Sequence, residues 1–206
     1  MTGEQSDPRG SPNEDITVLE LTTGILNDFL EFFDHSAFCD NPSWSGCYCV
    51  YYHTDNQEEW EKRTASENRD VAIRLIKEGR LQGLLAYLNK KPVGWCNAAS
   101  RNSLPRLAIS RDLRVEDAEG IGSIVCFVVA KPHRDRGIAS RLLEAACDSF
   151  SARGFPFAEA YPLKHAESDA ANFPGPLRMY LKQGFSVFRE LDRYLIVRKP
   201  LRKDGT

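Results

Sequence analysis

The sequence predicts a mixed α/β fold, in which helices pack on the faces of a sheet. Short apolar or alternating runs typical of strands are interspersed with segments of helical periodicity along the whole chain. The run 120–130 is almost entirely apolar and has the length of a central strand covered on both faces. A helical segment and another strand follow it, an order that implies a right-handed crossover to a parallel neighbour.

The composition and the two ends of the sequence suggest one domain with short tails. A chain of 206 residues with 42% apolar and 27% charged residues fits one globular domain, here assigned to 15–200. Residues 1–14 lack apolar periodicity and predict a disordered tail, and 201–206 form a C-terminal tail. The net charge of -2 gives no attraction to nucleic acid or to an anionic membrane. Without a membrane-length apolar run or a signal peptide, the expected location is the cytoplasm.

The first half of the chain predicts an opening strand and helix, a second helical region and a hairpin. The aromatic segment 47–53 fits either a strand or an ordered loop. The other expected elements are a strand over 16–21, a helix over 24–36, a helical region from about 56 to Gly79, and hairpin strands over 81–89 and 92–100 joined at Lys90 and Lys91.

The second half predicts a strand, helix, strand unit and a closing pair of strands. Residues 100–120 carry no clear pattern. The expected elements are the central strand 120–130, a helix from Gly137 to Gly154, a strand over 155–162, a short helix over 176–185 ending at Gly184, and strands over 186–191 and 193–199.

The loop KPHRDRG, residues 131–137, joins the central strand to the start of a helix. The first turn of a helix has unpaired amides and partial positive charge, which favour phosphate oxygens. Gly137 and Ala139 leave the amides of 136–140 open to a bulky anion, and Arg134 and Arg136 add charged donors. The pattern therefore predicts a diphosphate site, and its alternative is a solvated loop before an ordinary helix. The sequence has no phosphate-loop motif, and its one G-x-G precedes its strand.

The six cysteines predict reduced and mostly buried thiols. No C-x-x-C pair is present, so we expect no metal. One cluster leaves a thiol-metal or redox protein as an alternative, and it consists of Cys39, Cys47, Cys49 and His53. The C-x-C spacing within it is a poor match to that of zinc sites.

Two of these stretches resemble one known family. RDRGIA, within 128–139, resembles the acetyl-CoA signature Q/R-x-x-G-x-G/A of the GCN5-related N-acetyltransferase (GNAT) superfamily, and MYLKQGF, 179–185, resembles its last-helix signature. The order of elements agrees over nearly the whole chain, most closely with a bacterial subgroup whose substrates are mostly unassigned. The resemblance implies a mostly antiparallel central sheet with a splayed parallel strand pair, helices on both faces, and acetyl-CoA as the acyl donor.

The resemblance also implies roles for particular residues. Tyr180 matches the position whose phenol protonates the departing thiolate, with a packed aromatic as the alternative. Glu159, on the strand after the signature helix, is a candidate general base, with a solvent-facing side chain as the alternative. The strand residues expected along the pantetheine arm are Phe127, Val128 and Val129, and the loop residues expected at the pyrophosphate are Arg134, Asp135, Arg136, Gly137, Ile138, Ala139 and Ser140.

The implied activity is transfer of acetyl to a primary amine of a small molecule or peptide by direct attack. The alternative is a catalytically inactive CoA-binding sensor or scaffold. Asn172 lies in a long loop, 163–175, that can shape the acceptor pocket, and the aromatic segment 44–53 and Trp95 are expected at the acceptor side or in the core beneath it. Three acidic residues before the central strand either attract a cationic amine or lie in a solvated loop; they are Glu116, Asp117 and Glu119. Members of the superfamily often dimerise, so the sequence leaves open whether this protein forms a homodimer.

Overall fold

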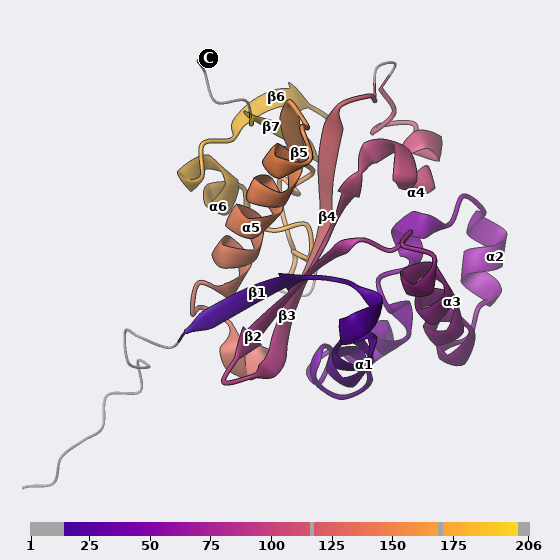
Figure 1. Ribbon diagram of the computed structural model, residues 1–206. Coiled ribbons are helices and arrows are strands. Elements are labelled where there is room, and N and C mark those ends of the chain that lie inside the picture. The colour runs from indigo at the N-terminus through magenta and orange to yellow at the C-terminus, as the bar shows by residue number, and fades with distance from the viewer. Residues whose placement is uncertain (1–14, 116–117, 169–170, 202–206) are drawn as a thin grey trace, which may run out of the picture.

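The computed structural model describes residues 15–115, 118–168 and 171–201, which form one sheet with helices on both faces (Figure 1). The sheet order is β1-β2-β3-β4-β5-β7-β6, and β4 and β5 are its parallel pair while the other neighbours are antiparallel. This arrangement confirms the predicted fold class. The strands are β1 Ile16–Glu20, β2 Gly83–Leu88, β3 Lys91–Ser100, β4 Ile121–Val129, β5 Phe157–Ala160, β6 Ser186–Glu190 and β7 Leu195–Pro200.

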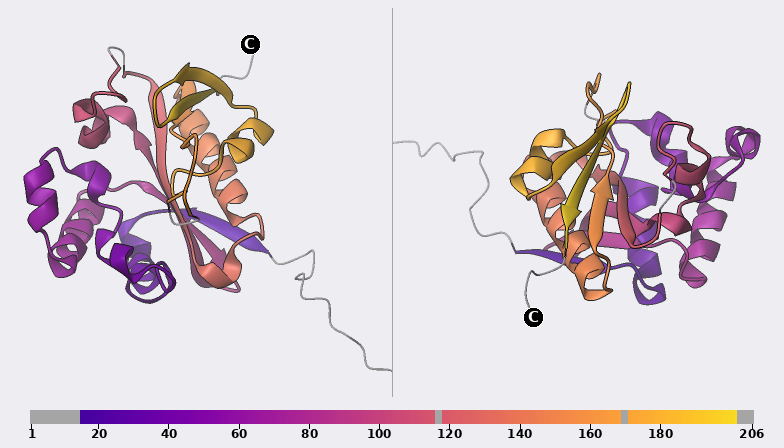
Figure 2. Two further views of the ribbon diagram at one scale, coloured as in Figure 1. Left: turned by 180° about the vertical axis from the view of Figure 1, so that it is seen from behind. Right: turned by 90° about the horizontal axis from the view of Figure 1, so that it is seen from above.

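The helices divide between the two faces of the sheet (Figures 1 and 2). Helix α5, Ile138–Ala152, packs its apolar stripe on β2, β3 and β4, and α6, Leu177–Lys182, contributes Tyr180 to the same core. The opposite face is covered by α1 Leu26–Glu31, α2 Gln57–Lys62, α3 Ala65–Lys77 and α4 Pro105–Ile109. Trp95 is fully buried beneath this second group of elements.

The predicted helical region 56–79 divides into α2 and α3 because Thr64 starts a new helix. The Thr64 hydroxyl accepts the N–H of Glu67 at 3.2 Å, and the Glu67 carboxylate accepts the N–H of Thr64 at 2.7 Å. This reciprocal cap satisfies two amides that a continuous helix would bond internally. Gly79 ends α3 in the left-handed conformation, as predicted.

Other local predictions are confirmed with shifts of a residue or two. The helix predicted over 24–36 is α1 continued by a π-helical turn, Phe32–Ser36. The hairpin turns at Asn89 and Lys90, both with positive φ, so Lys91 already belongs to β3. The aromatic segment 47–53 is an ordered loop with a 3-10 turn at Tyr51–His53, and α4 lies in the stretch that carried no pattern.

Several predictions fall outside the described residues. These are the tails, 1–14 and 202–206, and the acidic residues Glu116 and Asp117. Within the described part of the chain, none of the helices has the length and apolar character needed to cross a membrane.

Candidate active site

The two parallel strands separate after a short ladder. β4 pairs with β5 only from Ile121 to Ile124, whereas β4 continues to Val129. Backbone groups of alternate residues point to the same edge of a strand, so Phe127 and Val129 present theirs together. The N–H of Phe127 donates to the Phe173 carbonyl at 2.7 Å, and the Val129 carbonyl accepts Nε of Arg134 at 3.0 Å. The notch predicted between β4 and β5 therefore exists, and residues from two loops now bond to its edge.

The signature loop turns sharply into α5. Asp135 and Gly137 both have left-handed backbone conformations, with φ of 60° and 79°. A Cβ at Gly137 would meet no atom within 4 Å, so the backbone conformation and not the available space favours glycine there. The first helical bond runs from the Arg141 N–H to the Gly137 carbonyl, so the amides of 138–140 precede the internal ladder.

The two signature arginines have different surroundings. Arg134 donates to both carboxylate oxygens of Asp40, at 2.7 and 3.0 Å, in addition to its bond to Val129. These hydrogen bonds lower the pKa of Asp40 below its usual value. Arg136 instead lies with a terminal guanidinium nitrogen 3.4 Å from Nδ1 of His133. The Arg134 guanidinium is thus already oriented across the open edge of β4.

A cavity of about 920 Å³ extends from this loop to the aromatic loop 44–53. The predicted strand and loop residues line one end of it, except for Arg136. They are joined there by Asn172, Phe173 and residues of α6. The lining residues from the prediction are Phe127, Val128, Val129, Arg134, Asp135, Gly137, Ile138, Ala139 and Ser140.

The other end of the cavity has aromatic walls. The Tyr51 ring meets the Trp60 ring edge to face at 5.1 Å between centroids, and the Arg106 guanidinium lies 4.3 Å from the centre of the Tyr51 ring. Asn68 on α3 is buried, with its Nδ2 donating to the Gly46 carbonyl at 2.8 Å. Its Oδ1 has no hydrogen-bond partner among the described residues, which leaves an acceptor in the cavity wall.

Tyr180 lies beneath this cavity and is fully buried. Its hydroxyl donates to the Pro174 carbonyl at 2.5 Å, and its ring packs against Phe127 and Phe185 at 6.4 and 5.2 Å between centroids. Burial raises the pKa of the Tyr180 phenol well above 10, so the phenol carries its proton at neutral pH.

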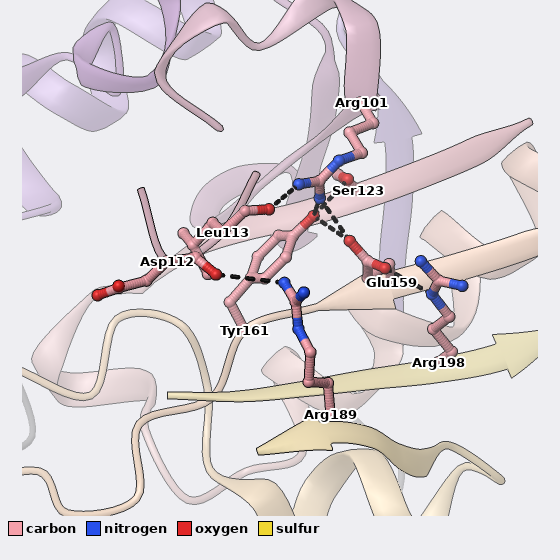
Figure 3. Close-up of polar contacts among 8 residues, drawn as sticks. All are labelled: Arg101, Asp112, Leu113, Ser123, Glu159, Tyr161, Arg189 and Arg198. Atoms are coloured by element: carbon pink, nitrogen blue, oxygen red, sulfur yellow. Dashed lines mark hydrogen bonds and ion pairs between the residues drawn. The ribbon is translucent and has the colours of Figure 1, made fainter. Parts of the chain in front are cut away.

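Glu159 is also fully buried, and it faces away from α5 because its neighbours Ala158 and Ala160 pack in the α5 core. Figure 3 shows its polar contacts. Its Oε1 accepts Nη1 of Arg101 at 2.5 Å and the hydroxyl of Tyr161 at 2.6 Å, and its Oε2 accepts Nε of Arg198 at 2.6 Å. Burial and the nearby carboxylate raise the pKa of Tyr161 well above 10. Glu159 is therefore the anion of a buried ion network. It neither lines the cavity nor faces solvent, and we do not retain it as the general base.

The sequence reasoning did not find several residues of the site. The carbonyl of Phe173 bonds to the edge of β4 and that of Pro174 to Tyr180, and the segment FPGP that contains them was the available signal, since two prolines around a glycine fix a loop. Asn68 and Arg101 had no signal, because each depends on a partner far away in the chain. Among the described residues, no three His, Cys, Asp or Glu side chains are grouped to hold a metal ion.

Sequence comparison agrees with this geometry. The profile of the acetyltransferase (GNAT) family matches residues 43–185, a span that includes the signature loop, the notch strands and α6. The chain belongs to this family. No curated protein matches the chain in sequence.

Solved structures of N-acetyltransferases share the fold. An N-acetyltransferase from Staphylococcus aureus Mu50 has 14% identity and a TM-score of 0.55, covering 91% of this chain and 99% of its own. The PaiA N-acetyltransferase of Thermoplasma acidophilum in complex with coenzyme A has 15% identity and a TM-score of 0.51, covering 90% and 99%. The ribosomal-protein-S18-alanine N-acetyltransferase of Escherichia coli has 13% identity and a TM-score of 0.50, covering 93% and 97%. At these identities the likeness establishes the fold alone.

Proposed function

We propose that this GNAT protein transfers acetyl from acetyl-CoA to a primary amine of a small molecule or peptide by direct attack. The observation that carries the proposal is that one continuous cavity runs from the open helix start at Gly137, along the part of β4 that extends beyond β5, to an aromatic end. A donor bound at the first end and an acceptor bound at the second would meet beside Phe127.

The residues at the helix start fit the diphosphate of CoA. The amides of 138–140 lack helical partners and lie at the positive end of the α5 dipole. Arg178 and Lys182 of α6 line the same end of the cavity and add positive charge. Along the strand, the carbonyl of Val129 would accept an amide N–H of the pantetheine arm, and the N–H of Phe127 would face the thioester at the end of that arm. Bound acetyl-CoA would replace the bonds that these two groups make now, from the Phe127 N–H to the Phe173 carbonyl and from the Arg134 guanidinium to the Val129 carbonyl.

The aromatic end suits an amine acceptor. Tyr51, Trp60 and Trp44 supply apolar walls, and the buried Oδ1 of Asn68 can accept an N–H. Glu61 adds a carboxylate that favours a cation. The Escherichia coli neighbour is named for acetylation of an alanine of ribosomal protein S18, so an amine acceptor also occurs on this fold.

The chain would contribute two groups to the transfer. A backbone N–H at Phe127, once released from Phe173, can donate to the thioester oxygen and stabilise its developing charge. Tyr180 does not line the cavity while its hydroxyl is bonded to the Pro174 carbonyl; once that bond opens, it would give its proton to the sulfur as the carbon–sulfur bond breaks and the new nitrogen–carbon bond forms. The attacking amine loses one proton to solvent. Acetyl-CoA supplies the acetyl group and leaves as CoA.

A second function is favoured by the surroundings of Tyr180. Its hydroxyl proton is held by the Pro174 carbonyl, and the phenol lies in a core of aromatic rings. A protein in which this bond never opens would bind CoA without chemistry, as a sensor or scaffold. Stoichiometric CoA binding without turnover of any amine in a broad panel would favour this alternative.

Thermal unfolding with acetyl-CoA, CoA, 3'-dephospho-CoA and ATP tests the proposal without knowledge of the acceptor. A ligand at about 100 times its dissociation constant stabilises the native state by about 2.7 kcal/mol, which corresponds to a shift of roughly 5 to 10 °C in a domain of this size. We expect such a shift for the CoA compounds and little for ATP. No shift at saturating acetyl-CoA would end the acetyltransferase proposal.

A further inference from the structure

Three thiols line the floor of the cavity, and the transfer chemistry uses none of them. Cys47 and Cys49 come from the aromatic loop, and Cys126 precedes Phe127 on β4. Cys49 is only 3% exposed, whereas Cys47 and Cys126 are half-buried. The thiol cluster, Cys47, Cys49 and Cys126, therefore lies between the acceptor loop and the strand that carries the notch.

Asn97 of β3 brings two of these sulfurs to one place. Asn97 is directly opposite Cys126 in the β3–β4 ladder, so both side chains point to the same face of the sheet. Nδ2 of Asn97 donates to the Cys49 carbonyl at 3.2 Å and to Sγ of Cys49 at 3.3 Å. Asn97 thus fixes the Cys49 side chain on the face of the sheet that Asn97 shares with Cys126, and all three belong to one neighbourhood below the cavity.

The surroundings distinguish Cys49 from its two neighbours. Burial raises the pKa of Cys47 to about 12, and the neighbouring Cys49 together with burial raises the pKa of Cys126. Burial acts on Cys49 as well, but the hydrogen bond from Asn97 and the neighbouring Cys126 thiol outweigh it and lower the pKa of the Cys49 thiol. Its backbone is left-handed, with φ of 55°, a conformation that a non-glycine residue keeps only when its surroundings hold it there.

We propose that Cys49 is a nucleophilic modification site in the cavity floor and that Cys126 is its resolving partner. A hydroperoxide is the reactant: the Cys49 thiolate attacks one peroxide oxygen, an S–O bond forms, the O–O bond breaks, and the other oxygen leaves as water or an alcohol. Cys126 then attacks the Cys49 sulfur, an S–S bond forms, and the S–O bond breaks with loss of water. The two thiols lose two electrons in total, and the peroxide gains them.

The disulfide would join the acceptor loop to β4 one residue before Phe127. The direct test treats the full-length protein with stoichiometric hydrogen peroxide, blocks the remaining thiols with iodoacetamide, and maps disulfides by mass spectrometry without reduction. Chymotrypsin is suited to the digest because it cleaves after Tyr48 and separates Cys47 from Cys49. We expect a cross-linked peptide that contains Cys49 and Cys126 and disappears on treatment with dithiothreitol. The test needs neither acyl-CoA nor an acceptor, so its outcome is independent of acetyl transfer.

Matched variants separate the roles of the three thiols. Cys47→Ser is expected to retain the cross-link, and Cys126→Ser is expected to leave a sulfenic acid on Cys49 that dimedone traps. In the native protein at pH 7, iodoacetamide is expected to alkylate Cys49 roughly tenfold or more faster than Cys47, because only the thiolate reacts. A cross-link through Cys47, or no cross-link in wild-type protein whose exposed Cys39 has been oxidised, would overturn the proposal. The wild-type digest decides the question even where a variant fails to fold.

Discussion

The Tyr180 hydroxyl binds the carbonyl of Pro174, while the carbonyl of the residue before it, Phe173, accepts the N–H of Phe127. Two successive carbonyls are therefore held by α6 on one side and by β4 on the other. The group that could protonate a leaving thiolate and the amide that could polarise a thioester are bonded to the same short segment. Binding of the pantetheine arm at β4 would compete directly with the bond between Phe127 and Phe173. It would also affect the bond between Tyr180 and Pro174, because Phe173 and Pro174 are adjacent in the chain.

Replacement of Tyr180 by phenylalanine tests the acid role and the packing role together. The variant leaves the Pro174 carbonyl without its partner, so we expect a loss of about 1 to 2 kcal/mol in the free energy of unfolding. If Tyr180 is the acid, turnover should fall roughly 100-fold with little change in affinity for acetyl-CoA. Denaturant unfolding and turnover under chemistry-limited conditions measure the two effects. A loss of stability with equal turnover would leave Tyr180 only its structural role.

Arg134→Glu tests the phosphate end of the site. The substitution places a carboxylate beside Asp40 and opposite the expected diphosphate, so the affinity for CoA should fall about tenfold or more. Arg141→Glu is the matched control, since Arg141 is an exposed residue of α5 that pairs with Glu144. Titration calorimetry with CoA compares the two variants. Equal losses of affinity would mean that Arg134 acts only through the general charge of this face.

Local sequence patterns were sufficient to predict the notch beside β4 and the start of α5. The apolar run of β4 and the small residues Gly137 and Ala139 each act over a few positions, and the structure places them as those patterns require. The division of the helical region 56–79 at Thr64 could also have been predicted, because Thr64 and Glu67 have the three-residue spacing of a capping box. This division was missed because the apolar periodicity of α3 was extended to the residues before the cap.

The surroundings of Glu159 could not be predicted in the same way. A carboxylate in a strand has the same sequence pattern whether it faces solvent, a cleft or a buried guanidinium. The partners that decide between these cases, Arg101 and Arg198, lie 58 and 39 residues away in the chain. Cys49 and Asn97, which are 48 residues apart, are a second example. Contacts of this range depend on tertiary packing, which single-sequence periodicity does not encode.

Gly137→Ala tests whether this glycine serves the backbone or the ligand. The left-handed φ of 79° makes any L-residue costly, so we expect a loss of about 1 to 2 kcal/mol in stability. Gly79→Ala is a close control, because Gly79 has φ of 68° and equally open space but lies at the end of α3. Both variants should lose similar stability, and only Gly137→Ala should also bind CoA more weakly. Unchanged CoA affinity in Gly137→Ala would show that a methyl group is tolerated at the expected phosphate site.

Glu159→Gln tests the structural interpretation of the buried network. The change removes the charge shared by Arg101 and Arg198 and leaves a buried guanidinium without a counter-ion, which should destabilise the protein by roughly 3 kcal/mol. Glu144→Gln, at an exposed pair, should change stability by less than about 0.5 kcal/mol. The pH dependence of turnover should be the same in wild type and Glu159→Gln. A pH profile that loses its acidic limb in Glu159→Gln would restore Glu159 as a general base.

His53 should make the stability of the protein depend on pH. Burial, with a smaller contribution from Arg80, lowers the pKa of His53 to about 4, and its Nε2 is buried with no hydrogen-bond partner among the described residues. An unfolded histidine titrates near pH 6.5, so between these values the unfolded chain binds more protons than the folded one. Stability should be complete above about pH 6.5 and should decline as the pH falls toward 4, by at most about 3 kcal/mol.

His53→Gln removes this titration and should flatten the decline, whereas His35→Gln, at an exposed position beside Glu31, should leave it unchanged. Urea unfolding of the three proteins between pH 4 and 7 measures the difference. The same slope in wild type and His53→Gln would mean that the native state accommodates a protonated His53.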